Sequence, residues 1–357
     1  MRIRYTDSTE EFSGLSYDET NNIFTINGDC SSTFEYMPVL KLDPEYDPQN
    51  FYYLFLANEN SSCTENSIYQ VYIERQRIGW IFPIQALLSA EHNEAENKFF
   101  LRYAYVALCL LLQDIENLDK QRMPDEFLLE DYYEVQKNIL VIDKENTSRI
   151  ESFSIEDYMV SLFQHGYARK GKGNILAEEL LIEQRKRINL KPISSELSMR
   201  FNINYLFEEQ LSIAESEIVR FYLCYQIIEL LIAAVFKDRF QKFLTTVSAE
   251  TEAMFDAREE LSIIAGEKYR IKCLFNDYVT CETQYKTDLN IACEKLLKLN
   301  GRKVAENYYE NLYSVRCLLV HKLYSLGEES YKILDEINRP LLQIVAESLF
   351  SFKKPTE

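Results

Sequence analysis

The sequence predicts an α+β protein, in which a β-rich N-terminal region is followed by an all-α helical bundle. Short runs of Tyr, Phe, Ile and Val separated by Asp, Asn and Gly turn residues fill the first 85 residues, a pattern typical of strands. From about residue 208, amphipathic stretches at helical spacing follow one another with short breaks, which indicates a bundle. We therefore expect an acidic β-rich domain with a helical end at 1–145, a connecting region at 146–204 and the bundle at 205–357.

The N-terminal region has two further predicted elements. The text NKFFLRYAYVALCLLLQDIENLD at 97–119 has the apolar spacing of a helix that ends before Pro124, and ILVID at 139–143 has the composition of one more strand. Within the bundle we expect five helices, at 208–245, 255–277, 282–299, 304–326 and 329–351.

Two basic segments lie in the connecting region. In HGYARKGKGN, Gly171 and Gly173 stand among three cations, for which a phosphate cradle and a solvated basic loop are the two interpretations. The GKS/T ending and the preceding strand of a P-loop are missing, which favours the solvated basic loop. For the run from Arg185 to Arg187 two interpretations stay open, a charged helix face or a cluster that steers RNA toward a site.

The charge is unevenly distributed along the chain. Residues 1–160 hold 12 Lys and Arg against 29 Asp and Glu, a net of -17, whereas 161–357 hold 27 against 28, a net of -1. An acidic surface repels phosphate, so any contact with nucleic acid is expected in the second half.

The cysteines and the apolar segments indicate the cellular location. Eight cysteines form no CxxC pair and no set with zinc-ligand spacing, so we expect no metal site, no cofactor and a reducing, cytoplasmic location. The N-terminus has no apolar run typical of a secretory signal. The run LCYQIIELLIAAVF at 223–236 is 14 residues long with Gln226 and Glu229 inside it, so we expect a buried helix and no membrane span.

The segment NLYSVRCLLVHKLYSL at 311–326 places Arg316 and His321 among apolar positions. On a helical wheel one face holds Leu312, Val315, Leu319 and Leu323. A second face holds Tyr313, Cys317, Val320 and Tyr324, with the Arg and the His at its margins. A helix that buries one face and offers another semi-apolar face predicts a subunit interface, so we expect a homodimer through this helix.

This R-x4-H spacing near the end of a helical bundle resembles the signature of HEPN domains. The segment RFYLCYQIIELLIAAVF at 220–236 is similar to the aromatic-rich helix of that family, which carries a Glu, here Glu229. The two matches cover roughly 205–355. The text FSGLSYDETNNIFTINGD looks like the opening of the β-rich domains that precede HEPN in ApeA-type bacterial defence proteins.

The resemblance implies metal-independent cleavage of RNA in bacterial anti-phage defence, abortive infection or toxin action. His321 would act as general base or acid at the ribose 2′-hydroxyl or the leaving oxygen. Arg316 would neutralise charge on the phosphate, and Glu229 would hold its guanidinium. RNA is the expected partner, and the resemblance names no trigger for the N-terminal domain. If the acidic half is an inhibitory cover, residues 195–357 alone should bind RNA better than the full chain.

Alternatives to an active enzyme stay open. Cys317 follows the Arg where active members usually carry a polar residue, often Asn, which favours a catalytically inactive HEPN-like module that binds a nucleotide, RNA or a protein partner. Arg316 and His321 are alternatively residues at the edge of a core, and Glu229 an ordinary ion-pair member, in a purely structural interaction protein. His92 and His165 have no partner pattern and are expected at the surface or in turns.

Overall fold

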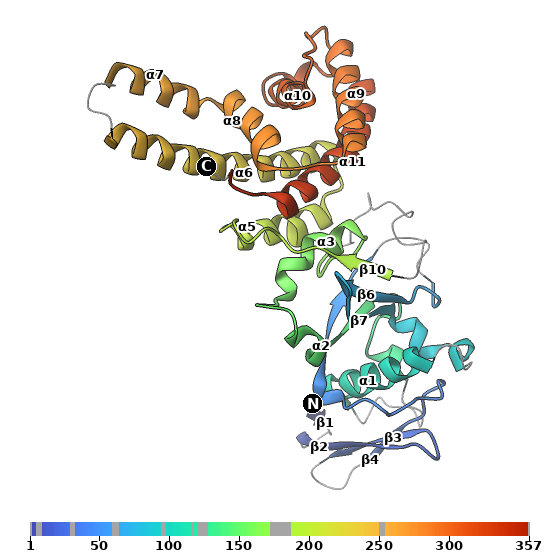
Figure 1. Cartoon of the computed structure of the whole chain (residues 1–357). Helices are drawn as coiled ribbons and strands as arrows, with labels where there is room; N and C mark the ends of the chain where they lie inside the picture. The colour runs from blue at the N-terminus through green and yellow to red at the C-terminus, as the bar shows by residue number, and fades with distance from the viewer. Residues whose placement is uncertain are drawn as a thin grey trace. The chain divides into compact units, whose positions relative to one another are not determined.

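The structure, a computed structural model, describes residues 2–4, 9–28, 33–58, 64–93, 98–115, 118–119, 128–171, 187–249 and 254–355. The chain divides into two compact units. Met1–Ser154 with His165–Leu190 form the sheet unit, and Ile155–Gln164 with Lys191–Glu357 form the helical unit (Figure 1). The expected α+β class is confirmed at this level, and the predicted connecting region 146–204 is shared between both units.

In its described residues the sheet unit has two five-stranded sheets. The first, in the order β4-β3-β2-β1-β8, consists of β1 (Arg2–Arg4), β2 (Thr9–Asp18), β3 (Ile23–Gly28), β4 (Thr33–Tyr36) and β8 (Leu118–Asp119). The second, in the order β10-β6-β7-β9-β5, consists of β5 (Phe51–Leu56), β6 (Tyr69–Ile73), β7 (Gln76–Pro83), β9 (Asn138–Asp143) and β10 (Arg187–Leu190). Both sheets are mixed, because β1 with β8 and β6 with β10 pair in parallel. The strand expected at 139–143 is β9.

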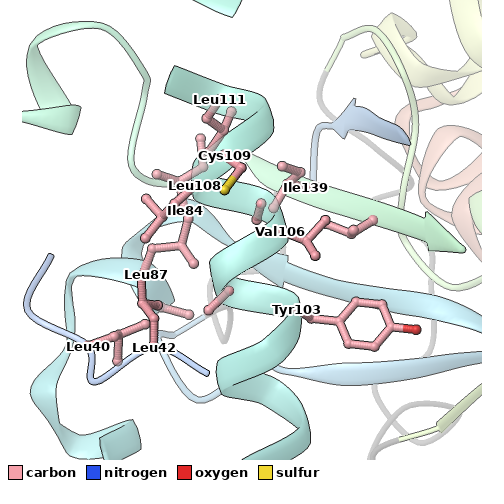
Figure 2. Close-up of a cluster of buried hydrophobic side chains, with 14 of the residues drawn as sticks. Leu40, Leu42, Ile84, Leu87, Tyr103, Val106, Leu108, Cys109, Leu111 and Ile139 are labelled. Atoms are coloured by element: carbon pink, nitrogen blue, oxygen red, sulfur yellow. The ribbon is translucent and has the colours of Figure 1, made fainter. Parts of the chain in front are cut away.

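Helix α1 (Lys98–Asp114) is the central element of this unit. Ten of its 17 residues are buried, and it contacts β2 of the first sheet and β5 and β9 of the second. Figure 2 shows Val106, Leu108 and Leu111 in one cluster with Leu40, Leu42, Ile84, Leu87 and Ile139. A helix packed from several sides needs apolar residues around most of its circumference, which explains the dense apolar text of this segment. The unit also contains α2 (Lys144–Ser148), capped by the Asp143 carboxylate.

His92 departs from its sequence expectation. Its side chain is buried, the ring Nε2–H donates to the carbonyl oxygen of Glu65 at 3.1 Å, and the ring packs edge-on against Phe100. The expectation of a surface or turn position was wrong for this residue, because its hydrogen-bond partner Glu65 comes from a segment 27 residues earlier in the chain. His165 lies in a turn, as expected.

The helical unit is a bundle of packed helices. They are α3 (Met159–Gln164), α5 (Arg200–Tyr205), α6 (Glu217–Ala249), α7 (Met254–Ala265), α8 (Glu267–Cys273), α9 (Thr283–Leu299), α10 (Tyr308–Lys322) and α11 (Glu328–Ser351). Helix α6 packs on α7, α8 and α11, while α9 packs on α10 and α11 (Figure 1). Helix α10 also contacts α8.

The helix boundaries depart from the predicted ones where the backbone breaks. The predicted helix 255–277 is interrupted at Gly266, and its last turn, Leu274–Tyr278, is a π-helix. The predicted start at 208 is instead a π-helical turn, Leu206–Gln210, and α6 begins at Glu217. The predicted helix 304–326 is shorter at both ends, since α10 covers Tyr308–Lys322. Helices α9 and α11 begin within one residue of the predicted positions and end at them.

Helix α6 is much longer than the 14-residue apolar run within it. Its segment Glu217–Thr245 is the only described one that is long and apolar enough to cross a membrane by length and composition. Half of its most apolar window is buried inside the helical unit. Asp238 is buried on this helix and accepts a hydrogen bond of 2.6 Å from the Tyr278 hydroxyl. The expectation of no membrane contact stays a prediction.

Candidate functional site

Helix packing brings Arg316 of α10 and Glu229 of α6 together. Nη2 of the Arg lies 3.1 Å from Oε1 of the Glu. The guanidinium also lies over the ring of Tyr225, with Cζ 5.6 Å from the ring centroid. This contact between the Arg fork and Glu229 is the one that the sequence interpretation required, and the catalytic role of both residues stays a prediction.

A second carboxylate, Glu267 at the start of α8, completes this cluster. Its Oε1 accepts a hydrogen bond of 3.2 Å from the Tyr225 hydroxyl. Burial by itself lowers the pKa of Arg316, but the hydrogen bond to Glu229 and the charge of Glu267 outweigh it and raise the pKa. Burial, with the nearby Glu267 charge, also raises the pKa of Tyr225. The guanidinium therefore stays charged, and the phenol stays a neutral hydrogen-bond donor.

His321 lies in different surroundings on the same helix. It is exposed, and it lines a cavity of about 320 Å³ formed by α8, the end of α9 with the loop after it, and α10. The lining residues are Lys268, Leu297, Arg302, Lys303, Tyr313, Ser314, Cys317, Leu318 and His321. Arg316 is not among them, in line with a rotation of about 140° between positions five residues apart on a helix. Within one chain the predicted catalytic pair does not line a common cavity.

The cavity is cationic although the chain as a whole is acidic. Lys268, Arg302 and Lys303 line it, and none of its described lining residues is Asp or Glu. In the described part of the chain, no ion pair engages any of these three side chains. Their positive charge is therefore available to an anion.

The end of α9 fixes where Arg302 and Lys303 lie. Gly301 has a φ of +62°. Its N–H donates to the backbone carbonyl oxygen of Lys298 at 3.1 Å, and the Arg302 N–H donates to the carbonyl oxygen of Leu297 at 2.9 Å. These two bonds form a Schellman motif, which ends a helix with a residue in the left-handed region. The chain leaves α9 in a defined direction, and the two cations follow at once.

The loop after these cations is held by Asn311, which is fully buried in the first turn of α10. Its Oδ1 accepts from the N–H of Ala305 at 2.7 Å, and its Nδ2 donates to the carbonyl of Ala305 at 3.0 Å and to Oδ1 of Asn290 at 2.8 Å. One side chain thus ties the loop to α9 and α10. The cationic wall of the cavity is organised without a ligand.

Lys268 reaches the cavity because α7 ends at Ala265 and α8 begins just after Gly266. Its Nζ lies 5.7 Å from the ring centroid of Tyr313. The sequence interpretation missed Lys268, Arg302, Lys303 and Asn311. Two signals were present, namely Gly266 inside a predicted helix and the Gly301-Arg302-Lys303 run immediately after one.

The two predicted faces of α10 are present with changes. Leu312, Val315 and Leu319 are buried, as is Leu318, whereas Leu323 follows the helix and is half-buried. Of the expected interface residues, Val320 and Tyr324 are 46% and 88% exposed. Tyr313 and Cys317 are half-buried and line the cavity instead.

The basic segments of the connecting region are described only in part. Lys172, Gly173, Arg185 and Lys186 lie outside the described residues. Arg187 begins strand β10, and its guanidinium carbon lies 5.1 Å from the ring centroid of Tyr72. A charged helix face is therefore the wrong interpretation for Arg187.

Among the described residues, no group of three or more His, Cys, Asp or Glu side chains is arranged to hold a metal ion. Comparisons with protein-family models, with curated proteins and with solved structures find no match to this chain.

Proposed function

We propose that this protein is an endoribonuclease of HEPN type that needs no metal ion and acts in bacterial defence or as a toxin. Arg316 and His321 are the catalytic residues, and Glu229 positions Arg316. The observation that supports the proposal is the arrangement on α10, where an exposed His borders a cavity with three cations while an Arg five residues earlier is held by Glu229 and Tyr225.

The chemistry of RNA cleavage suits these residue types. The ribose 2′-oxygen attacks the adjacent phosphorus, the bond to the 5′-oxygen breaks, and the products carry a 2′,3′-cyclic phosphate and a 5′-hydroxyl. An imidazole exchanges protons near neutral pH, so His321 removes the 2′-hydroxyl proton or protonates the leaving oxygen. The permanently charged guanidinium of Arg316 stabilises the negative charge that builds on the phosphate oxygens.

A complete site requires two chains in this proposal. Arg316 and His321 of one chain are separated by about 140° of rotation and about 7.5 Å of rise along the helix, too far apart to hold one phosphate together. A two-fold axis through the exposed Val320 and Tyr324 places a second α10 beside the first, so that each site receives residues from both chains. The homodimer is therefore part of the proposal.

The test is incubation of the purified protein with total RNA, with and without a chelator, followed by analysis of the product ends. Cleavage should persist in chelator and leave 2′,3′-cyclic phosphates. His321→Ala should lower the rate by about a hundredfold to ten-thousandfold, since that is the usual contribution of one general acid or base. Glu310→Ala is the control, because Glu310 is exposed on the same helix and does not line the cavity. Chelator-sensitive cleavage, or full activity of His321→Ala, contradicts the proposal.

A second candidate is a catalytically inactive module that binds a nucleotide or RNA. Cys317 favours it, because the thiol lines the cavity where active HEPN members usually carry a polar residue, and a thiol is a weak hydrogen-bond donor and acceptor. Binding of RNA without any cleavage in the same assay identifies this candidate.

A further inference from the structure

The cationic cavity has its own organisation, separate from the pair of Arg316 and Glu229. Among its described lining residues, Lys268 comes from α8, and Arg302 and Lys303 from the loop between α9 and α10. Tyr313, Leu297 and Leu318 form a less polar part of the lining. The cavity thus combines cations with apolar and aromatic surface, and His321 lies at its border with the proposed catalytic helix face.

Three like charges in a cavity whose described lining holds no carboxylate repel one another, and an anion reduces that repulsion. Two ammonium groups and one planar guanidinium suit a phosphate, which accepts several charge-assisted hydrogen bonds at once. A volume of about 320 Å³ lies within the range of small-molecule pockets and is large enough for one nucleotide. The apolar wall suits the flat face of a base.

We infer that this cavity is a subsite for one nucleotide of the RNA strand, with Lys268, Arg302 and Lys303 binding the phosphate next to the scissile one. The inference rests on the proposed function where it names RNA as the source of that nucleotide. The Schellman motif at Gly301 and the bonds of Asn311 hold the loop in place before the ligand arrives, so little ordering cost opposes binding. The three cations are positioning residues, which bind the strand while Arg316 and His321 act on it.

The test measures equilibrium binding by the full chain at several salt concentrations. The probes are a single-stranded RNA oligonucleotide with 2′-O-methyl riboses, which cannot be cleaved through the 2′-oxygen, a 5′-mononucleotide and inorganic phosphate. Substitution of Lys268→Gln, Arg302→Gln and Lys303→Gln together should weaken oligonucleotide binding by at least about tenfold. The slope of log affinity against log salt should become shallower by about 0.7, because about 0.7 is lost for each phosphate contact to a single strand and the three cations bind one phosphate.

A matched control removes the same charge elsewhere in the helical unit. Lys295→Gln, Lys332→Gln and Arg339→Gln together remove two Lys and one Arg that pair with neighbouring carboxylates outside the cavity, and this variant should bind as the wild type does. Lys303→Gln alone serves if the triple variant fails to fold, because Lys303 is exposed, and it should weaken oligonucleotide binding by about threefold or more.

The outcomes separate the subsite from the proposed cleavage. Equal binding by the triple variant and the wild type overturns the subsite, even if the wild type cleaves RNA. Weakened binding by the triple cavity variant, together with unchanged binding by the control variant, supports the subsite. This holds even if no cleavage is found and the proposed function fails. Tighter cavity-dependent binding of the mononucleotide or of phosphate than of the oligonucleotide overturns RNA as the source.

Discussion

The ion pair of Arg316 and Glu229 is only partly shielded, with side-chain exposures of 24% and 46%. An ion pair of this exposure contributes about 0 to 1 kcal/mol to the free energy of unfolding. Its consequence is geometric, because the carboxylate and the Tyr225 ring restrict where the guanidinium points. At the scale of the residue, the pair is better suited to orient the guanidinium, the proposed catalytic group, than to stabilise the fold.

Glu229→Gln therefore separates orientation from stability. We expect the free energy of unfolding to change by less than about 1 kcal/mol, while kcat for RNA cleavage falls and KM changes little, since the variant leaves the cavity intact. Thermal unfolding and steady-state kinetics measure the two effects. The matched control is Glu336→Gln, which breaks the pair with Lys295 through a similarly exposed carboxylate and should leave kcat unchanged. An unchanged kcat in Glu229→Gln argues against a positioning role.

Buried thiols make stability depend on alkaline pH. Burial raises the pKa of Cys109 and of Cys224 from 9.0 to about 12. Between these values the folded chain keeps both thiols protonated, whereas the unfolded chain ionises them. Their stabilising contribution is present in full below pH 9 and is lost as the pH rises toward 12, by up to about 1.4 kcal/mol per pH unit for each thiol.

We expect the melting temperature under reducing conditions to fall between pH 8.5 and 10. Cys224→Ala should lower the melting temperature at every pH through lost packing but show a shallower fall, because one ionisable thiol is absent. Parallel curves for the variant and the wild type contradict this account of Cys224.

At the scale of the element, the end of α9 decides whether the cationic wall exists. A Cβ at Gly301 meets no atom within 4 Å, so a substitution there acts through the backbone alone. A left-handed conformation costs an ordinary residue about 1 to 2 kcal/mol. If the backbone at residue 301 leaves the left-handed conformation to relieve that strain, the direction in which Arg302 and Lys303 follow the helix changes.

Gly301→Ala should thus lower the free energy of unfolding by about 1 to 2 kcal/mol and also weaken RNA binding, as measured by chemical denaturation and titration. Gly327→Ala is the control, because Gly327 has a φ of -80° and equally open surroundings before α11. The control should be neutral or slightly stabilising. Equal stability of the two variants shows that the left-handed turn is not required.

At the scale of the whole molecule, the helical unit is discontinuous in sequence. This changes which fragment tests whether the acidic N-terminal half inhibits RNA binding. Residues 155–164 belong to it, and within it Phe163 packs on Phe207 and Asp157 pairs with Arg200. A fragment of 195–357 loses these contacts, so its RNA binding does not isolate the effect of the acidic residues. A fragment of 155–357 retains them and is the better comparison with the full chain, and of the sheet unit it contains residues 165–190.

The structure also decides which substitutions test the predicted homodimer. Tyr313 lines the cavity, so its replacement changes the subsite as well as any interface. Val320→Glu with Tyr324→Glu alters only exposed side chains and should convert a dimer to a monomer and stop cleavage, with helical content unchanged. Light scattering and circular dichroism measure this. Ile291→Glu with Leu299→Glu adds the same charge at exposed positions of α9 and should leave the dimer intact. A wild-type monomer that cleaves RNA at low concentration contradicts the shared site.

The sequence by itself determined the elements whose signal is local. Apolar spacing predicted α9 and α11 closely, and it predicted the start of α1, but α1 ends at Asp114 and Leu118–Asp119 form strand β8 where the helix was expected to continue. It also predicted the buried face of α10 at Leu312, Val315 and Leu319, because a helix buries residues at a period that is readable in the chain. The resemblance also named Glu229 as the partner of Arg316, and the two side chains are in contact.

Only the tertiary structure decided what depends on segments that are distant in sequence. The hydrogen bond of buried His92 goes to the carbonyl oxygen of Glu65, 27 residues away, and no pattern around the histidine predicts this contact. The cavity joins Lys268 to Arg302 and Lys303, which are more than 30 residues away along the chain, through a break at Gly266 and a left-handed turn at Gly301. Charge at such a site is set by which helices pack together, and helix packing is a property of the folded chain, not of any one segment.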